Sequence, residues 1–460
     1  MAQGFTALIM AAGKGTRMRS ELPKVLHTVC GKPMVEWVID AAREAGAERI
    51  VCVVRPGDGV ADGLPDGVAI AEQREGEGTG AAVLAARDSI GGDGPVVVLS
   101  GDHPLVSGEL ISGLVRTHGD DGAAATLLTT EELDPAGYGR IVRGQDGAVE
   151  RIVETKHPEE VPAEELAIRE INIGAYAFDA GELVSALDEV QVGANGERYL
   201  TGVFPVLRAR GSRIVSHRTA DVRSAFGVNS RADLIEAEEL ARLELIGRHA
   251  NAGVTFEAPE TTVIEADVEI GRDTRIAQGV TLRGSTTIGS GCEIGPHSTV
   301  ADATVGDRAR VLQSWLVECE VGADASIGPY AYLRPGTRIG EGAKVGTFVE
   351  IKNSDIGRGA KVPHLSYIGD AEVGEESNLG ASTITANYDG RREHRTKLGK
   401  RVKTGVHTSL VAPVDVGDRA YTAAGSAITD DVPEGALGVA RPRQTNVEGF
   451  AERAEEETRE

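Results

Sequence analysis

The chain has 460 residues, with 48 basic and 71 acidic side chains and a formal net charge of −23. This excess of acid argues against nucleic acid or an anionic membrane surface as a partner, although a local cluster of Lys and Arg can still bind a nucleotide. No apolar run approaches the roughly 18–20 residues that span a bilayer. The N-terminus lacks the basic and apolar regions of a signal peptide. Four cysteines without paired or metal-like spacing indicate reduced thiols in a cytosolic protein.

The first predicted strand, residues 5–10, runs into a glycine-rich loop, AAGKGTRM at 11–18, which precedes a predicted helix. A strand, a glycine turn and a helix are typical of phosphate or nucleotide sites. The loop does not fit a Walker A motif, because Gly13 and Lys14 stand in the wrong order and spacing. It does not fit a dinucleotide fingerprint either, since Met18 takes the place of the third glycine. The alternative is a plain glycine turn with surface cations.

Strand-like runs alternate with amphipathic helices as far as about residue 230, which predicts an α/β domain with a Rossmann-like, mainly parallel sheet. The opening loop and the segment LSGDHPL lie at the carboxyl ends of predicted strands, where such sheets bind ligands. Further predicted elements are 48–54, 79–90, 94–102, 107–118 and 122–130. Residues 230–250, which hold no proline, then predict one linker helix between two domains.

Beyond residue 250 an aliphatic residue recurs at every sixth position, and glycine often follows it. Such a period predicts a parallel β-helix, in which three six-residue sides make one coil and the aliphatic side chains fill a narrow core. The first run is Ile264, Ile270, Ile276, Leu282, Ile288, Ile294 and Val300; after a slip, the second is Val321, Ile327, Leu333, Ile339, Val345 and Ile351. We therefore expect domains at 1–229 and 251–460, joined by the helix.

These features together make the chain resemble one bacterial family, the bifunctional N-acetylglucosamine-1-phosphate uridyltransferases / glucosamine-1-phosphate N-acetyltransferases. The resemblance rests on GKGTRM followed by LPK, on GDHPL, on DPAGYGRI, and on RPGTRIGEGAKVGTFVEIKNS, HLSYIGDAEVG and ITANYDG in the second half. It covers about residues 5–446. The resemblance implies a nucleotidyltransferase domain, a left-handed β-helix, a cytoplasmic homotrimer with acetyltransferase sites between subunits, and roles in peptidoglycan and cell-wall synthesis.

For the first half, the resemblance implies uridylyl transfer from UTP to N-acetylglucosamine 1-phosphate. Arg17 and Lys24 would neutralise the phosphates, and Asp102 and Asn229 would hold Mg²⁺. Taken alone, an acid or an amide after a strand is often only a turn or helix cap. The implied contacts with nucleotide and sugar are Met10, Ala11, Ala12, Gly13, Gln73, Gly78, Thr79, Gly139, Glu154, Asn172 and Asn229.

For the second half, the resemblance implies acetyl transfer from acetyl-CoA to glucosamine 1-phosphate. His364 would be the general base, because the sugar amine attacks only when it is deprotonated. The alternative is a structural histidine that fills a gap in a coil. Residues implied to hold the sugar phosphate are Arg334, Lys352, Tyr367 and Asn378; those implied for acetyl-CoA are Ala381, Asn387, Tyr388, Val406, Ala424 (or its neighbour Ala423) and Arg441.

The chain departs from the family pattern at five positions. Ala81 replaces a histidine, Ile173 a small polar residue and Gly202 an aspartate, all in the first half. In the second half Glu393 replaces a lysine near the anionic cofactor and Val406 a serine. These changes leave open a weaker or altered use of acyl-CoA.

Three alternatives follow. The first is a uridylyltransferase whose second half serves only as an oligomerisation scaffold. The others are a non-catalytic regulatory subunit with this two-domain architecture and a transferase for another hexose. His364 and the intact sugar-phosphate residues argue against the first alternative, whereas Glu393 and Val406 argue for it. The retained Arg17, Lys24, Asp102 and Asn229 argue against the second, and the sugar-phosphate residues of the second half argue against the third.

Overall fold

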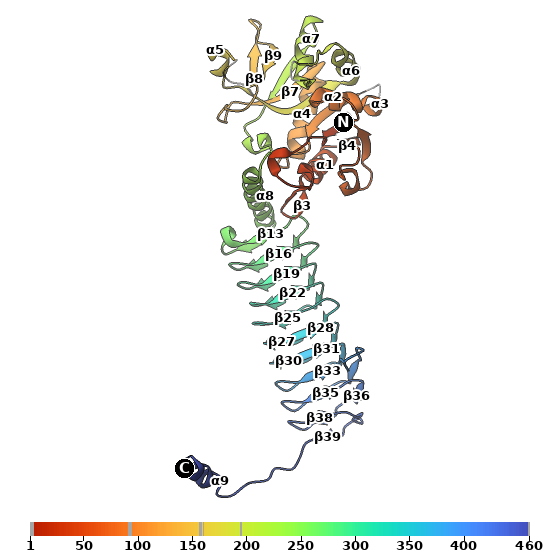
Figure 1. Ribbon diagram of the computed structural model, residues 1–460, viewed down its shortest axis with the longest axis vertical. Helices are drawn as coiled ribbons and strands as arrows, with labels where there is room; N and C mark the ends of the chain where they lie inside the picture. Colours follow the sequence, from red (N-terminus) through yellow and green to blue (C-terminus); the bar gives the residue numbers. More distant parts are fainter. Residues whose placement is uncertain (1–3, 91–93, 156–158, 160, 194–195, 459–460) are drawn as a thin grey trace. The chain divides into compact units, whose positions relative to one another are not determined.

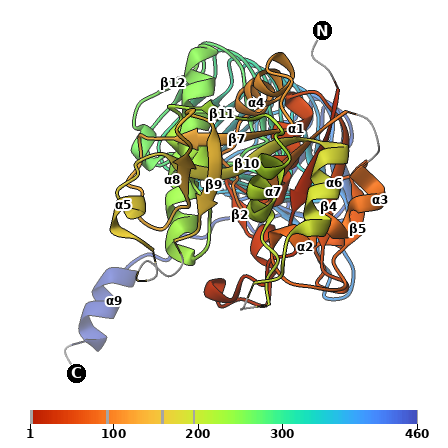
Figure 2. The same cartoon turned by 90° about the horizontal axis from the view of Figure 1, so that it is seen from above.

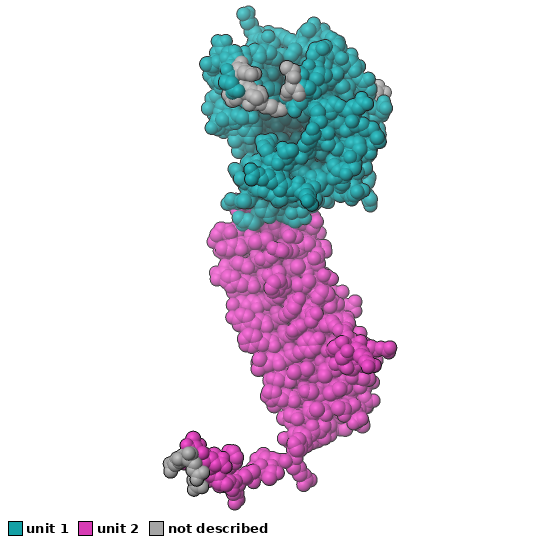
Figure 3. All heavy atoms as spheres, in the orientation of Figure 1, with its two compact units in different colours: residues 1–242 teal, residues 243–460 magenta. Residues whose placement is uncertain are grey.

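The computed structural model describes residues 4–90, 94–155, 159, 161–193 and 196–458 of the chain. The contacts between residues divide it into two compact units, 1–242 and 243–460 (Figure 3), which we call the N-terminal and C-terminal units. The division falls inside α8 (Arg231–Asn251), a helix at the position where the sequence predicts one. Among the described helices, none combines the length and the apolar character of a membrane span.

A sheet of nine strands forms the middle of the N-terminal unit (Figures 1 and 2), in the order β11-β7-β10-β6-β1-β4-β5, with β8 and β9 attached at β10. Strands β6, β1, β4 and β5 are parallel to one another, as predicted. Strand β10 is antiparallel to both β6 and β7, so the sheet is mixed. The strands are β1 (Phe5–Met10), β4 (Ala47–Val54), β5 (Ala69–Glu72), β6 (Pro95–Ser100), β7 (Ala125–Thr130), β8 (Arg140–Arg143), β9 (Val149–Val153), β10 (Ile171–Asp179) and β11 (Ile214–Arg218); β2 (Thr28–Val29) and β3 (Lys32–Pro33) form a separate pair.

Helices cover both faces of this sheet, which explains the nearly continuous apolar runs of its strands. Along β1, Leu8 packs into the cluster formed with α2, α6 and α7, whereas Ala7 and Ile9 pack into the cluster formed with α1 and α4. This alternation follows from the period of two along a strand. The helices are α1 (Met34–Glu44), α2 (Thr79–Ala85), α3 (Arg87–Ile90), α4 (Gly108–Asp120), α5 (Ala163–Leu166), α6 (Ala180–Glu189) and α7 (Val203–Ala209).

The C-terminal unit is a left-handed parallel β-helix whose short strands stack into three sheets (Figure 1). The first sheet holds β12 (Thr255–Phe256), β15 (Arg275–Ile276), β18 (Glu293–Ile294), β21 (Arg310–Val311), β24 (Ser326–Ile327), β27 (Lys344–Thr347) and β30 (Lys361–His364). The second holds β13 (Val263–Ile264), β16 (Thr281–Arg283), β19 (Thr299–Ala301), β22 (Trp315–Val317), β25 (Tyr332–Leu333), β28 (Glu350–Lys352), β31 (Tyr367–Gly369), β33 (Ile384–Ala386), β35 (Ser409–Val411) and β38 (Ala427–Ile428).

The third sheet holds β14 (Glu269–Ile270), β17 (Thr287–Ile288), β20 (Thr304–Val305), β23 (Glu320–Val321), β26 (Arg338–Ile339), β29 (Asp355–Ile356), β32 (Ala371–Val373), β34 (Thr396–Leu398) and β36 (Val414–Val416). Strands β37 (Tyr421–Thr422) and β39 (Leu437–Gly438) pair with each other, and α9 (Phe450–Glu457) follows.

The aliphatic residues of the six-residue period are buried inside this β-helix, so the predicted core is confirmed. The slip in the period has a simple cause. After Val300 the core positions continue at Val305, Val311, Leu316 and Val321, all at most 3% exposed, so three of the four steps have five residues instead of six. The register of the coils survives because the shortening falls in the corners between strands.

Close approach of neighbouring coils explains the glycine that often follows the aliphatic residue. A Cβ atom added to Gly271 would lie 2.6 Å from the backbone of Gly289, and one added to Gly340 would lie 2.7 Å from the backbone nitrogen of Arg358. No side chain fits at such distances.

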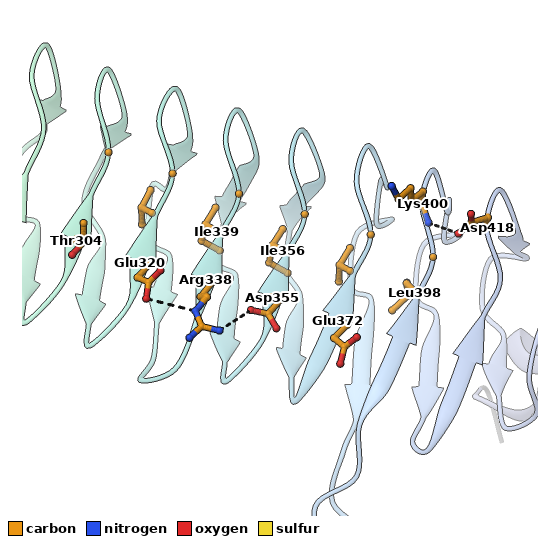
Figure 4. A pocket seen from close by; sticks show the side chains of 18 residues that line it. Thr304, Glu320, Arg338, Ile339, Asp355, Ile356, Glu372, Leu398, Lys400 and Asp418 are labelled. Carbon is orange, nitrogen blue, oxygen red and sulfur yellow. Dashed lines mark hydrogen bonds and ion pairs between the residues drawn. The ribbon is translucent and has the colours of Figure 1, made fainter.

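The same corners border a groove of about 940 Å³ along the third sheet (Figure 4), where Arg338 lies 3.5 Å from Glu320 and 3.7 Å from Asp355. None of the residues lining that groove is a predicted site residue.

Candidate functional site

The glycine-rich loop leaves β1 at the middle of the sheet and is fixed by a hydrogen bond from the Ala11 amide to the carbonyl of Val53, 2.9 Å. Gly15 has φ 57°, and a Cβ there would lie 2.7 Å from the Cβ of Lys24, so glycine is needed at this turn. A Cβ on Gly13 would meet nothing within 4 Å. The loop therefore wraps around Lys24 and presents an open face at Gly13.

A pocket of about 340 Å³ lies at the carboxyl ends of β1, β4 and β6, which is the edge where α/β sheets bind ligands. Ala11 is buried behind it, 2% exposed. Eight predicted residues line the pocket: Met10, Ala12, Gly13, Lys24, Gln73, Gly78, Thr79 and Asp102. The structure thus brings together two loops that are about 60 residues apart in the sequence.

Three contacts join the predicted phosphate-binding residues to the predicted metal-binding residues. Lys24 forms an ion pair with Asp102, and its ammonium also lies 3.3 Å from Oδ1 of Asn229. Arg17 donates to the same Oδ1 at 2.8 Å. Asp102 accepts in addition from Oγ of Ser100 at 2.6 Å, and its Oδ1 lies 2.8 Å from Nδ1 of His103. Burial would raise the pKa of Asp102, but the hydrogen bond and charge of His103, with the charge of Lys24, hold that pKa below its ordinary value.

Asp102 and Asn229 fit a magnesium ion by the chemistry of their donor atoms. Both offer oxygen, and both already contact one cation, the ammonium of Lys24. Mg²⁺ is typically bound by one or two protein oxygens together with water and substrate phosphates. Among the described residues no group of three or more His, Cys, Asp and Glu side chains could hold a metal, so a site at Asp102 would depend on the substrate for further ligands.

Of the predicted sugar-binding residues, Asn172 lies on β10, Gly139 directly precedes β8, and Glu154 directly follows β9. The amide of Asn172 donates to the carbonyl of Gly139 at 2.9 Å, and Nδ2 of Asn172 donates to the hydroxyl of Tyr176 at 2.7 Å. The pairing of β8 with β9 places Gly139 across from Glu154, whose Oε1 accepts from Thr201 at 3.0 Å. Gly139, Glu154 and Asn172 therefore form a group of their own and do not line the pocket just described.

Packing accounts for two of the three departures from the family pattern in this unit, Ile173 and Gly202, and nothing in the structure explains Ala81. Ile173 is 4% exposed and belongs to the core cluster of α1 and α4, where an apolar side chain fits. A Cβ at Gly202 would itself lie 2.6 Å from Cγ1 of Val190. Ala81 is 8% exposed in α2.

In the C-terminal unit, the predicted base and some of the predicted cofactor residues fall into one column on successive coils. His364 pairs with Thr347, and its carbonyl accepts the amide of Ser382, so Ala381 comes next to it on the following coil. The amide of His407 donates to Ala381, and that of Gly425 donates to Val406, which continues the column to Val406 and Ala424. We call this the His364 column.

The predicted phosphate-binding cations form a second column, on the second sheet. Strands β25, β28 and β31 are neighbours, and their register places Arg334 beside Lys352 and Lys352 beside Gly369. Adjacent strands are about 4.8 Å apart, so two cations can reach one phosphate. Gly369 leaves this space open, since a Cβ there would lie 2.5 Å from the hydroxyl of Tyr367 and 2.9 Å from Nδ2 of Asn387.

Both cations are paired with carboxylates in this structure. Arg334 lies 2.9 Å from Glu350. Lys352 forms an ion pair with Glu393 and lies 3.5 Å from Asp370. The hydrogen bond that Lys352 donates to Glu393 is the main reason why the pKa of Lys352 is raised. Glu393, the charge reversal in the family pattern, therefore meets a residue predicted to bind the sugar phosphate.

Asp370 is a residue of this site that the sequence analysis missed. It is 4% exposed and accepts from Asn353 at 2.6 Å and from Asn387 at 2.5 Å. Burial would raise its pKa, but these amides and Lys352 lower it, so the carboxylate stays charged. Each asparagine lies 17 residues away, one on either side, which is the spacing of one coil and could have revealed the trio.

The remaining predicted residues lie around these columns. Asn378 bridges Lys361 and Lys403 on the continuation of the first sheet. Tyr388 is 61% exposed on the loop after β33. Cδ of Arg441 lies 4.0 Å from where a Cβ on Gly425 would stand, at the end of the His364 column.

Fold and site together define a nucleotidyltransferase unit followed by a hexapeptide-repeat transferase unit. The MobA-like NTP transferase domain matches residues 7–159, and the bacterial transferase hexapeptide (six repeats) matches residues 318–353. The chain is 48% identical to the bifunctional protein GlmU of Streptomyces avermitilis, over 97% of this chain and 94% of the relative. It is 45% identical to that of Halalkalibacterium halodurans, over 96% and 98%, and 45% identical to that of Mycolicibacterium vanbaalenii, over 97% and 92%.

The chain belongs to the bifunctional GlmU family, and it is an enzyme that joins a nucleotidyltransferase to an acetyltransferase.

Proposed function

We propose that this chain makes UDP-N-acetylglucosamine in two steps. Acetyl-CoA first acetylates glucosamine 1-phosphate, and UTP then donates a uridylyl group to the N-acetylglucosamine 1-phosphate, releasing diphosphate. The observation that carries the proposal is the grouping of the predicted residues: Arg17, Lys24, Asp102 and Asn229 make direct contacts in one unit, and the His364 column stands in the other. Mass spectrometry of a reaction with glucosamine 1-phosphate, acetyl-CoA, UTP and Mg²⁺ should detect the sugar nucleotide, and its absence would refute the proposal.

In the uridylyl step, an oxygen of the sugar phosphate attacks the α-phosphorus of UTP, a new P–O bond forms, and the bond to the β-phosphate breaks. Catalysis of such a step is mostly positioning and charge compensation. Lys24 and Arg17 contribute two positive charges at the pocket. Asp102 and Asn229 would hold Mg²⁺, which neutralises phosphate charge when bound. The pocket at Gln73, Gly78 and Thr79 receives the nucleotide base.

In the acetyl step, His364 removes a proton from the sugar ammonium, and the amine attacks the thioester carbonyl and forms the C–N bond. The C–S bond then breaks, and the sulfur leaves as the thiol of CoA with a second proton from the attacking nitrogen. The amide of Ala381, a residue one coil from His364, stabilises the oxyanion in this proposal. Arg334 and Lys352 hold the sugar phosphate. Acetyl-CoA extends along the His364 column, which covers about 14 Å from His364 to Ala424 at the usual strand spacing, toward Arg441.

A homotrimer is the proposed assembly, in the cytoplasm. Exposed aromatic and aliphatic side chains gather on successive coils of the C-terminal unit, and contiguous apolar patches mark interaction surfaces. They are Trp315, Tyr330, Tyr332, Phe348 and Leu365, with Tyr330 stacked on Phe348 at 5.4 Å between ring centroids. Cyclic symmetry closes contacts of this head-to-tail kind. Light scattering should give three times the chain mass; a monomer with full acetyltransferase activity would contradict the trimer.

One observation favours a second candidate, a uridylyltransferase whose acetyltransferase unit is impaired or altered in acyl preference. Glu393 pairs with Lys352 and so competes with the sugar phosphate for that cation. Under this alternative the chain releases diphosphate from UTP but no thiol from acetyl-CoA.

A further inference from the structure

A guanidinium that the sequence analysis did not single out lies in the nucleotide pocket. Arg55 directly follows β4, and its side chain is 27% exposed. Its Nε donates to the carbonyl of Ala12 in the glycine-rich loop at 2.6 Å, and its Nη2 donates to Oε2 of Glu77 at 2.7 Å. The other carboxylate oxygen of Glu77 lies 2.9 Å from the ammonium of Lys14. One carboxylate thus holds two cations that come from two different loops.

The backbone holds Glu77 in this position. The amide of Arg198 donates to the carbonyl of Glu77 at 2.8 Å, and Glu77 forms a bridge with Glu197. The next residue, Gly78, has φ 94°, and a Cβ there would lie 2.6 Å from the carbonyl oxygen of Arg198. The turn is therefore fixed on both sides of Glu77, while the carboxylate itself stays on the exposed side of the pocket.

Lys14, Arg55 and Glu77 all line the pocket together with Lys24 and Asp102. A triphosphate carries several negative charges, and its oxygens can accept charge-assisted hydrogen bonds from both Arg and Lys. It therefore offers these two cations more negative charge than the single carboxylate of Glu77 does. Lys14 and Glu77 are 62% and 43% exposed, so breaking their ion pair costs little. A ligand with enough charge can take both cations from Glu77.

We propose that Lys14, Arg55 and Glu77 form a clasp over the nucleotide pocket, which a triphosphate opens by replacing the Glu77 carboxylate as the partner of both cations. The clasp deepens the proposed uridylyl transfer and rests on it for the identity of the nucleotide. Arg55 is a positioning residue here, because its hydrogen bond to Ala12 also holds the glycine-rich loop in place. A monophosphate carries too little charge to open the clasp, so the clasp selects for triphosphates.

The test measures the binding of UTP, UMP and inorganic tripolyphosphate by calorimetry to the full chain and to Glu77→Gln. Glutamine has the same shape as glutamate, and its side-chain oxygen can still accept a hydrogen bond from Arg55. Because it is neutral, it no longer compensates the positive charges of Lys14 and Arg55. We expect Glu77→Gln to bind UTP and tripolyphosphate roughly three- to tenfold more tightly than the wild-type chain does, which is the scale of exchanged exposed ion pairs. The affinity for UMP should increase by a larger factor than the affinity for UTP. Glu75→Gln is the matched control: it removes the same charge from the same turn, but Glu75 lines a different pocket and is exposed.

The clasp would be overturned by weaker UTP binding in Glu77→Gln, or by the same gain in affinity in Glu75→Gln. Lys14→Gln should weaken tripolyphosphate binding, and the double variant Lys14→Gln/Glu77→Gln should lose most of the gain made by Glu77→Gln. Strictly additive effects would contradict a shared ion pair. Tripolyphosphate carries no base, so its binding tests the clasp without relying on uridylyl transfer. A wild-type chain that does not turn over UTP would refute the proposed function but not the clasp.

Discussion

The two units assemble their sites by different routes. In the N-terminal unit, Arg17 and Lys24 meet Asn229 across more than 200 residues of sequence, because the carboxyl ends of several strands share one edge of a sheet. In the C-terminal unit, His364 and Ala381 meet across one coil, 17 residues along the chain. A globular fold can therefore combine distant segments at one pocket, whereas a β-helix places site residues in columns that its own repeat defines.

This difference predicts that the two activities can be lost separately. The largest effect is expected at Asp102, the carboxylate that contacts Lys24, Ser100 and His103. Asp102→Ala should lower uridylyl transfer by several orders of magnitude, because the change removes both the proposed metal ligand and the ion-pair partner of Lys24, a cation whose side chain is only 12% exposed. Acetyl transfer, measured as thiol release, should stay nearly unchanged. If both activities fell together, the separation of the two sites would be wrong.

The corresponding change in the C-terminal unit is His364→Ala. The kcat of acetyl transfer should fall by roughly 10²–10⁴-fold, the usual contribution of a general base. The pH profile of kcat/KM should also lose its acidic limb, whereas diphosphate release and the melting temperature should hardly move. His297→Ala, at an exposed corner of an earlier coil, is the control. Near-normal acetyl transfer in His364→Ala would favour a structural histidine.

Stability should be local in the β-helix, because each coil contacts only its neighbours. Ile351 is fully buried between Leu333 and Ile368 on the second sheet. Ile351→Ala should reduce the free energy of unfolding of this unit by about 2–5 kcal/mol. Denaturant unfolding followed by loss of acetyl transfer should shift to lower concentration, with the midpoint for uridylyl transfer unchanged. A common shift of both midpoints would mean that the units unfold as one.

The smallest effect is expected from Glu393, which competes for Lys352. Glu393→Gln should lower the KM for glucosamine 1-phosphate a few-fold, with kcat little changed, since an exposed ion pair is worth roughly 0–1 kcal/mol. Glu372→Gln, on the third sheet, is a control that leaves Lys352 untouched. A higher KM in Glu393→Gln would show that Glu393 helps to bind the substrate instead of competing with it.

The sequence predicted the β-helix because its core is periodic: one aliphatic residue per side marks the coils over residues 264–300 and 321–351. The coils after Ile351 were not placed by this period. It also predicted β1, β4, β6 and the helices between them. It did not predict that β10 runs antiparallel to β6 and β7, because strand direction depends on chain connections that carry no local pattern. The roles of the predicted residues were inferred from the order of the motifs in the sequence. Their contacts with one another could be seen only in the folded structure.

The missed residues fall into two groups. Arg55 and Glu77 contact each other across two loops, and neither stands in a motif, so only tertiary structure reveals the pair. Asp370 is different, since its two asparagine partners lie one coil away on either side. In a repeat protein, polar residues that are one coil apart in the sequence lie close together in space, just as the aliphatic residues do. A sequence analysis can therefore identify such polar groups by their spacing.

The central claim, one chain with two separate transferase sites, is tested most directly by two assays on the same purified protein. One follows thiol release from acetyl-CoA with glucosamine 1-phosphate, and the other follows diphosphate release from UTP with N-acetylglucosamine 1-phosphate and Mg²⁺. We predict that both products form. Diphosphate without thiol would contradict the claim and leave the C-terminal unit as a scaffold.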